Sequence, residues 1–216
     1  LIQKYKLYWR KSGLKPYWGN VYMDHLKKHN PKNFLEIGVF CGVTARNTCD
    51  YLSKVHDNEF SYIGVDFFGV DFLNKSSTNE IQPKFLQTHK FSNPLKNIYY
   101  NFIRRENINS IESVSRLLKK YEKNIKLVQG DTNMVLKNLD LSKIDYAFVD
   151  GGHSYNTVMN DLNILKQKIG NNKVILCDDY GDPCLIEDVR NAVNDFAKSN
   201  NLKVNTIENR FAEIIT

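Results

Sequence analysis

Short apolar runs recur along the chain, and several of them end at an acidic residue. The run from Tyr146 to Val149 is rich in residues that favour β-strands, and it stops at Asp150. A second run, residues 173–177, is followed by two more acids, Asp178 and Asp179. The same type of pattern predicts strands at residues 33–38, 61–66, 125–129, 146–149, 173–177, 202–207 and 211–215.

Between these runs, apolar residues recur three to four positions apart, which is the spacing of an amphipathic helix. Helices are predicted over residues 21–29, 43–55, 111–123, 134–139, 155–167 and 186–199. Thr44 is the expected cap of the second of these helices. Because helices alternate with strands, we expect an α/β fold with a mostly parallel sheet and helices on both faces. A turn at residues 208–210 would make the last strand antiparallel.

The chain divides into a lead-in, residues 1–30, and a main domain, residues 31–216. The lead-in is basic and aromatic, and we favour an amphipathic segment packed on the domain over a nucleic-acid-binding arm. Residues 67–123 form an insertion with ten Lys or Arg against five Asp or Glu. We interpret part of this insertion as a cap over the substrate; a packing helix or a dimer contact are the alternatives. Arg104 and Arg105 fit a solvated charge pair better than a contact with an anionic acceptor.

The composition is that of a soluble globular chain, with 216 residues, 42% hydrophobic and 25% charged. The net charge of +6 favours a solvated basic surface over an anionic partner. None of the four cysteines forms a CxxC pair, so we expect a reducing compartment, a cytoplasmic location and no structural zinc. No apolar run is long enough to span a bilayer, and no membrane partner is expected. The chain begins at Leu1, which leaves open a segment upstream.

The acids at the strand ends are the strongest chemical signal. Neighbouring parallel strands would place Asp150, Asp178 and Asp179 together at one edge of the sheet, where open α/β folds bind ligands. Three carboxylates in one cleft repel each other unless a cation or protons compensate. We therefore predict a metal-assisted site. The alternative is that Asp150 or Asp178 caps the following helix and that no metal binds.

A glycine turn follows the first predicted strand. Gly38 and Gly42 match neither the dinucleotide-binding GxGxxG pattern nor a P-loop. Glu36 precedes the first glycine by two residues and can accept hydrogen bonds from the turn or from a cationic ligand group. Asp66, at the end of the second strand, is placed to accept from a ribose diol, and Asp131 from an adenine amino group. Each acid alone is equally consistent with a helix cap or a surface residue.

Together these motifs resemble the class I S-adenosylmethionine (SAM)-dependent methyltransferases. The resemblance is carried by residues 34–42, 62–66, 130–132, 148–155 and 176–180, and it covers roughly residues 33–66 and 125–216. The pattern Asp-Gly-x-His-x-Tyr followed by Asp-Asp-Tyr is similar to the branch that contains macrocin-type sugar O-methyltransferases and cephalosporin-hydroxylase-like proteins. The implied fold is Rossmann-like, with a seven-stranded, mostly parallel sheet and a last antiparallel strand.

The resemblance also implies roles for single residues. Gly38 and Gly42 would pass close to the methionine part of SAM, with Glu36 near its amino group. Asp66 would bind the ribose, and Asp131 with Thr132 the adenine. The metal Mg²⁺ would be held by Asp150, Asp178 and Asp179. The general base would be His153, beside the catalytic Asp150.

The expected reaction is methyl transfer to a hydroxyl of a sugar or another small molecule. A hydroxyl near Mg²⁺ is acidified, and His153 could then take the proton. A metal or substrate contact and a purely structural turn are the alternatives for His153. Tyr155 and Tyr180 flank the cleft and could stack on an acceptor ring, although packing is the more common role of single aromatics.

Other functions stay open on the sequence. The same fold could methylate RNA or protein, but the three aspartates argue against nucleic acid as the acceptor. A non-catalytic domain that keeps the fold is a second alternative. The sequence does not decide whether the chain forms a homo-oligomer.

Overall fold

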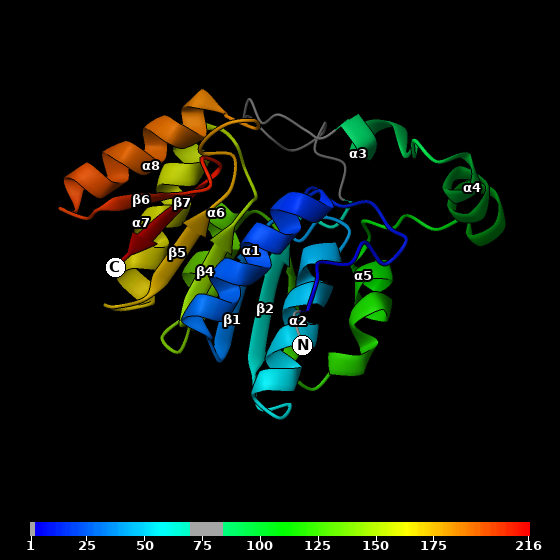
Figure 1. The fold of residues 1–216 in the computed structure, drawn as a ribbon, viewed down its shortest axis with the longest axis horizontal. Helices are drawn as coiled ribbons and strands as arrows, with labels where there is room; N and C mark the ends of the chain where they lie inside the picture. Colours follow the sequence, from blue (N-terminus) through cyan, green and yellow to red (C-terminus); the bar gives the residue numbers. More distant parts are fainter. Residues whose placement is uncertain (1–2, 70–83) are drawn as a thin grey trace.

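The apolar runs form one seven-stranded sheet in the computed structural model, which describes residues 3–69 and 84–216 (Figure 1). The strand order is β3-β2-β1-β4-β5-β7-β6. Only β7 runs antiparallel to its neighbours β5 and β6. The expected mostly parallel sheet with a last antiparallel strand is thus confirmed. The strands are β1 (Asn33–Ile37), β2 (Ser61–Asp66), β3 (Ile125–Gln129), β4 (Tyr146–Val149), β5 (Val174–Cys177), β6 (Val204–Ile207) and β7 (Phe211–Ile215).

The strand order reverses at β1, which lies between β2 and β4. In open α/β sheets, ligands bind outside the carboxyl ends of the strands at such a reversal. Register pairs Val149 of β4 with Cys177 of β5, so the residues that follow these two strands leave the sheet side by side. Asp150 and Asp178 are these residues. The sheet therefore brings the predicted acids to one edge.

Helices cover both faces of the sheet, because strand residues alternate between two apolar clusters. Phe34 and Phe148 belong to the cluster that packs against α1, α2 and α5. Leu35 and Ala147, one position away in each strand, belong to the cluster that packs against α7 and α8 (Figure 1). The longer helices are α1 (Pro16–His29), α2 (Val43–Val55), α5 (Ile111–Leu118), α7 (Tyr155–Lys168) and α8 (Glu187–Ser199).

Several predicted boundaries move. The first helix begins at Pro16 instead of Val21, because proline has the φ angle of the first helical turn and its missing N–H is not needed there. Thr44 does not cap α2: Gly42 occupies the cap position, and the Thr44 hydroxyl lies 2.8 Å from the Tyr5 hydroxyl instead. The predicted helix 111–123 ends as a 3₁₀ turn, and the predicted helix 134–139 begins earlier. The short elements are α6 (Thr132–Val135), η4 (Leu136–Asn138) and η3 (Lys119–Tyr121).

The lead-in packs into the main core. Tyr5, Leu14 and the α1 residues Tyr22 and Leu26 are buried in the cluster that contains β1 and β4 residues. These contacts agree with the favoured interpretation, in which the rings of the lead-in pack on the domain.

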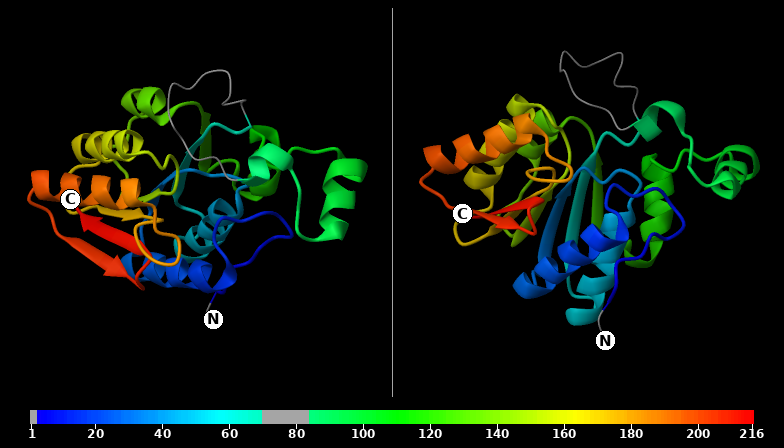
Figure 2. Two further views of the ribbon diagram at one scale, coloured as in Figure 1. Left: turned by 90° about the horizontal axis from the view of Figure 1, so that it is seen from above. Right: turned by 45° about the horizontal axis from the view of Figure 1, so that its top comes forward.

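The insertion departs from the sheet on the β2 side. Its described elements are α3 (Lys84–Thr88), α4 (Pro94–Asn97) and the π-helix η2 (Ile98–Arg104), which project from the body of the molecule (Figure 2). They form a separate aromatic cluster that includes Phe85, Phe91 and Tyr100. Residues 70–83 of the predicted insertion lie outside the described residues.

Two expectations about composition can be compared with the described residues. All four cysteines are free, and three of them are buried. Within residues 3–69 and 84–216, no helix combines the length and the apolar character that a membrane crossing requires.

Candidate active site

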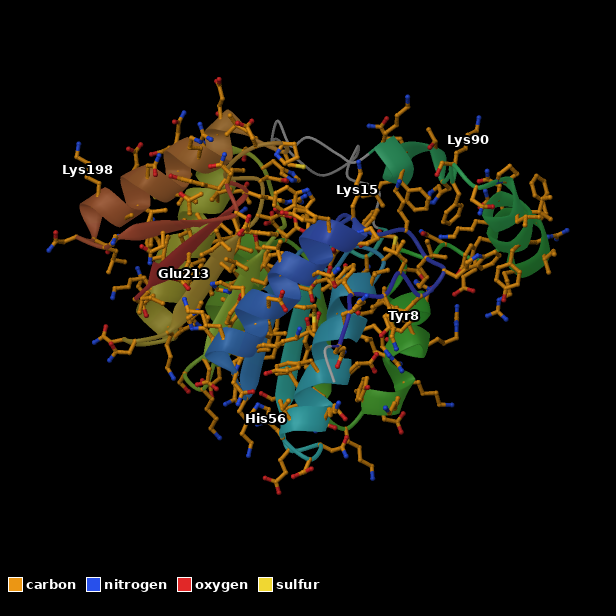
Figure 3. All side chains as sticks on the ribbon, viewed as in Figure 1. Tyr8, Lys15, His56, Lys90, Lys198 and Glu213 are labelled. Carbon is orange, nitrogen blue, oxygen red and sulfur yellow. The ribbon has the colours of Figure 1, made fainter. Side chains whose placement is uncertain are left out.

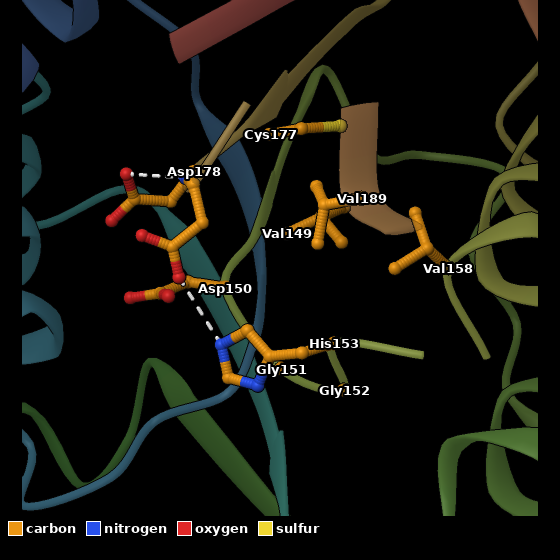
Figure 4. Close-up of a pocket in the computed structure, with 10 residues that line it drawn as sticks. Val149, Asp150, Gly151, Gly152, His153, Val158, Cys177, Asp178 and Val189 are labelled. Carbon is orange, nitrogen blue, oxygen red and sulfur yellow. Dashed lines mark hydrogen bonds and ion pairs between the residues drawn. The ribbon is translucent and has the colours of Figure 1, made fainter. Parts of the chain in front are cut away.

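A small cavity lies where β4 and β5 end, and the predicted acids surround it (Figure 4). Its volume is about 10 Å³, which is room for about one water molecule or a small ion. Asp150, His153, Asp178 and Asp179 all line it, with the Gly151 and Gly152 turn between the first two. Three predicted metal ligands and the predicted base thus meet at one point.

Asp178 is held by an arginine that the sequence analysis did not select. Arg210 Nε lies 2.6 Å from Asp178 Oδ1, and Arg210 Nη2 lies 2.6 Å from Oδ2. Both side chains are buried, and the Arg210 guanidinium also lies 5.5 Å from the centre of the Trp18 ring. A bidentate arginine pair uses both carboxylate oxygens. In this conformation Asp178 is therefore engaged by a cation of the protein itself.

Asp150, His153 and Asp179 form a tighter group. One ligand atom from each lies within 4.8 Å of the others. His153 Nε2 is 3.1 Å from Asp179 Oδ2. Burial raises the pKa of Asp150 well above its ordinary value, and the neighbouring carboxylates of Asp178 and Asp179 raise it further. Such a group gains from a divalent cation, because two carboxylates and an imidazole can supply ligand atoms and the cation relieves the repulsion.

The glycine turn after β1 packs directly against this group. Gly38 has φ +91°, and a Cβ atom there would lie 1.9 Å from the Asp150 carbonyl oxygen. Asp66, at the end of β2, accepts hydrogen bonds from the backbone N–H of Phe40 at 2.7 Å and of Phe68 at 2.8 Å. The predicted ribose acid therefore also fixes the turn. Gly42 has φ +76° and is the N-cap of α2.

Glu36 is buried beneath the turn. The Tyr62 hydroxyl donates to Glu36 Oε2 at 2.6 Å. Burial raises the pKa of Glu36 to about 8, although the Tyr62 hydrogen bond acts in the opposite direction. The side chain is thus poised between its neutral and charged forms near neutral pH, and a cationic ligand group would favour the charged form.

A second buried arginine that the sequence did not point to, Arg10 of the lead-in, lies beside the turn after β1. Arg10 is buried and donates from Nε to the Cys41 carbonyl oxygen, in the turn after β1, at 2.9 Å. It also donates from Nη2 to the Ile108 carbonyl oxygen of the insertion and to Ser113 Oγ at 2.9 Å. One guanidinium therefore connects the lead-in, the turn and the insertion.

Asp131 and Thr132 lie at the end of β3. Asp131 is the N-cap of α6, and its carboxylate accepts from the backbone N–H of Asn133 at 2.9 Å. Asp131 thus acts as a helix cap, which was one of the alternatives that the sequence left open. Thr132 is buried as the first residue of α6. A contact of either residue with adenine stays a prediction.

Tyr155 and Tyr180 do not line the cavity. The Tyr155 hydroxyl donates to Asp195 Oδ2 at 3.0 Å, and the Tyr180 hydroxyl donates to Asn194 Oδ1 at 2.9 Å. Both partners lie on α8. Both tyrosines are thus hydrogen-bonded to α8. Their stacking on a ring of the methyl-accepting substrate stays a prediction that the geometry does not support.

Neither Arg10 nor Arg210 carried a usable signal in the sequence. Arg10 is one of many basic residues in the lead-in, and Arg210 is part of a predicted hairpin turn. A lone arginine in a turn is usually exposed. Only the position of β7 beside β5 shows that Arg210 reaches the strand ends.

Comparison with known proteins identifies the family of the chain. A family model described as a methyltransferase domain matches residues 35–180. No curated protein sequence matches the chain.

Solved structures share the fold at low sequence identity. The O-methyltransferase TomG from Streptomyces achromogenes, involved in tomaymycin synthesis and solved in complex with SAM, is 12% identical. The match covers 94% of this chain and 82% of that one, with a TM-score of 0.60. The methyltransferase PaMTH1 from Podospora anserina, bound to SAH, is 16% identical, with coverage of 94% and 79% and a TM-score of 0.57. The calicheamicin methyltransferase CalS11 is 16% identical, with coverage of 90% and 77% and a TM-score of 0.58.

Proposed function

Because the chain belongs to the methyltransferase-domain family, we propose that it transfers the methyl group of SAM to a hydroxyl of a small-molecule acceptor, with Mg²⁺ as a cofactor. A sugar or a glycosylated compound is the proposed acceptor class. The observation that carries the proposal is the meeting of Asp150, Asp178, Asp179 and His153 at one cavity beside the glycine turn. Structural neighbours named as O-methyltransferases support the choice of oxygen as the acceptor atom.

The proposed SAM site lies along the ends of β1, β2 and β3. The turn from Gly38 to Gly42 would contact the methionine part, with Glu36 below it. The ribose would bind at Asp66, and the adenine at Asp131 and Thr132. The amides that now donate to Asp66 keep its position fixed, so the carboxylate is preorganised for a diol.

The proposed Mg²⁺ ligands are Asp150 and Asp179. Mg²⁺ is commonly held by one or two carboxylates and keeps several waters. When bound, the ion would make an acceptor hydroxyl more acidic. Asp178, paired with Arg210, would position Asp179, whose backbone N–H donates to Asp178 Oδ1 at 2.8 Å. We thus propose two of the three predicted aspartates as Mg²⁺ ligands, and we propose that Asp178 positions Asp179.

His153 is the proposed general base. The Asp179 carboxylate, 3.1 Å from Nε2, orients the imidazole toward the cavity. The ring would take the proton of the acceptor hydroxyl as the oxygen attacks the methyl carbon. Alignment of oxygen, methyl carbon and sulfur would lower the remaining barrier. The proximity of His153 to Asp150 and Asp179 also permits a second role, that of a metal ligand.

Calorimetric titration with S-adenosylhomocysteine tests the cofactor. We expect saturable binding that Asp66→Ala weakens by at least about tenfold, because the ribose hydroxyls lose a charged acceptor. Asp140→Ala, which removes an exposed aspartate from a loop, is the matched control and should bind as the wild type does. No detectable heat at millimolar ligand would refute the proposed function.

Mg²⁺ titration separates the two roles of His153. If His153 is the base, His153→Ala keeps the Mg²⁺ affinity and loses about 10²–10⁴-fold in kcat on a sugar acceptor. If it is a ligand, His153→Ala weakens Mg²⁺ binding as Asp179→Asn does. Full activity of the wild type in EDTA would eliminate the metal from the proposal.

A further inference from the structure

A second group of metal-ligating side chains lies away from the strand-end cavity. It consists of His25 and His29 on α1 and Glu213 on β7, and one ligand atom from each lies within 4.8 Å of the others. Glu213 lies on the face of the sheet that α1 covers (Figure 3). Residues four apart on a helix project from the same face. The two imidazoles therefore converge on one carboxylate.

The distances are close to those of a metal site. His25 Nε2 and His29 Nε2 each lie 2.7 Å from the same oxygen, Glu213 Oε2. In a tetrahedral zinc site with bonds of about 2.1 Å, neighbouring ligand atoms lie about 3.4 Å apart. Each contact must open by only about 0.7 Å to admit the ion. The His29 side chain is 20% exposed, so it can move and also give the ion a path from solvent.

Each buried ligand has a second partner that would orient it. His25 Nδ1 lies 2.7 Å from the Tyr146 hydroxyl, and Asn205 Nδ2 donates to Glu213 Oε1 at 3.0 Å. Metal-bound histidines almost always use the other ring nitrogen in a hydrogen bond, and metal-bound carboxylates are also hydrogen-bonded. The Tyr146 hydroxyl can donate or accept, so it suits either tautomer of His25.

The electrostatics also permit a cation. The Glu213 carboxylate supplies a negative charge for the cation. Among the described residues, Lys28 opposes a cation, since its Nζ lies 4.0 Å from Glu213 Oε2. The Lys28 side chain is 65% exposed and can turn toward solvent when an ion enters. Imidazole nitrogens with one carboxylate oxygen form a ligand set typical of Zn²⁺.

We propose that His25, His29 and Glu213 bind a Zn²⁺ ion that links α1 to β7. The ion would tie the lead-in to the last strand of the sheet, with a water as its fourth ligand. The expectation of no structural zinc rested on cysteine spacing and did not consider histidines and carboxylates. This site is independent of the proposed methyl transfer, so either proposal can fail alone.

Calorimetric titration with Zn²⁺ tests the site. The protein is first treated with a chelator and carries Asp179→Asn, which removes a ligand from the strand-end cavity. We expect one Zn²⁺ per chain and a Tm that rises with free Zn²⁺. In this Asp179→Asn background, His29→Gln should weaken Zn²⁺ binding by at least about 100-fold, because it removes a ligand. Tyr146→Phe should weaken it by about 10–100-fold, because it removes the partner that orients His25.

His56→Gln is the matched control, because it removes an imidazole whose Nε2 contacts the Pro31 carbonyl oxygen instead of a carboxylate. It should leave Zn²⁺ affinity unchanged. Equal affinity in the His29→Gln protein and its parent would overturn the proposal. Co²⁺ provides a measurement that needs no ligand variant: the parent protein should show tetrahedral absorption bands that Zn²⁺ removes, and their absence would also overturn the proposal.

Discussion

At the scale of single residues, Gly38 shows how the site is assembled. The resemblance predicted that this glycine lets the cofactor approach the backbone. Within the described residues it has a further reason: its α-carbon packs against the Asp150 carbonyl, where a Cβ atom would lie at 1.9 Å. The turn after β1 and the turn after β4 therefore depend on each other. A side chain at position 38 would separate them.

Gly38→Ala should lower the free energy of unfolding by about 2–5 kcal/mol, since it combines a left-handed backbone with a steric clash. Gly170→Ala is the matched control. Gly170 also has a positive φ, +80°, but no atom lies within 4 Å of its added Cβ. We expect a loss of only about 1–2 kcal/mol there. Urea unfolding of both variants measures the difference, and equal losses would contradict the role of the close approach.

At the scale of elements, Glu106 connects η2 to α5 within the insertion. Its carboxylate accepts from Ser113 on α5 and from Arg116 at 2.7 Å, and it pairs with Arg104 of η2 at 3.2 Å. Burial acts to raise the pKa of Glu106, but these hydrogen bonds outweigh it and lower the pKa to about 2. Arg104, expected to be solvated with Arg105, thus has a partner in its own segment.

The depressed pKa of Glu106 predicts a pH dependence. The contribution of Glu106 to stability is complete above the unfolded pKa of 4.5 and is lost as pH falls from 4.5 toward 2. In this range the unfolded state binds a proton at Glu106 more readily than the folded state does, which favours unfolding. Glu106→Gln should cost about 1–3 kcal/mol at pH 7 and progressively less as pH falls through this range.

Urea unfolding between pH 3 and 7 checks this dependence against Glu59→Gln. Glu59 pairs with Lys32 at 3.1 Å, but its side chain is 78% exposed, so its removal should cost about 0–1 kcal/mol. A difference between wild type and Glu106→Gln that does not change with pH would contradict the assigned pKa.

At the scale of the whole molecule, the last hairpin completes the strand-end site. β7 lies between β5 and β6, so the turn before it places Arg210 beside Asp178. The ion pair is buried on both sides. Removal of one partner from such a pair leaves an uncompensated charge in the interior.

Arg210→Met should therefore lower the free energy of unfolding by about 3–5 kcal/mol at pH 7. Adding Asp178→Asn should recover part of this loss, because the buried charge is removed. Arg190→Met is the control: Arg190 lies over the Tyr180 ring and donates a hydrogen bond to the Tyr180 carbonyl oxygen. Its loss should lower the free energy of unfolding by about 1 kcal/mol. If the double variant is no more stable than Arg210→Met, the loss does not come from the unpaired carboxylate.

The sequence by itself determined the sheet, the helices that pack on it and the positions of the strand-end acids, but it did not predict the short helices α3, α4 and η2 of the insertion. These features follow from local rules: the period of apolar residues sets the element, and the carboxyl ends of parallel strands share one edge. Asp150, Asp178 and Asp179 were found in this way, whereas the role of His153 came from the family resemblance. Errors fell at helix ends, where Pro16 and Gly42 decided the boundary.

Only the tertiary structure decided which side chains meet. Arg210 and Asp178 are 32 residues apart, Arg10 and Ile108 are 98 apart, and His25 and Glu213 are 188 apart. Such contacts depend on strand order and on the helix that covers each face, and no local pattern encodes them. For this reason the sequence could predict that acids gather at the strand ends, but not that an arginine of the protein already neutralises one of them.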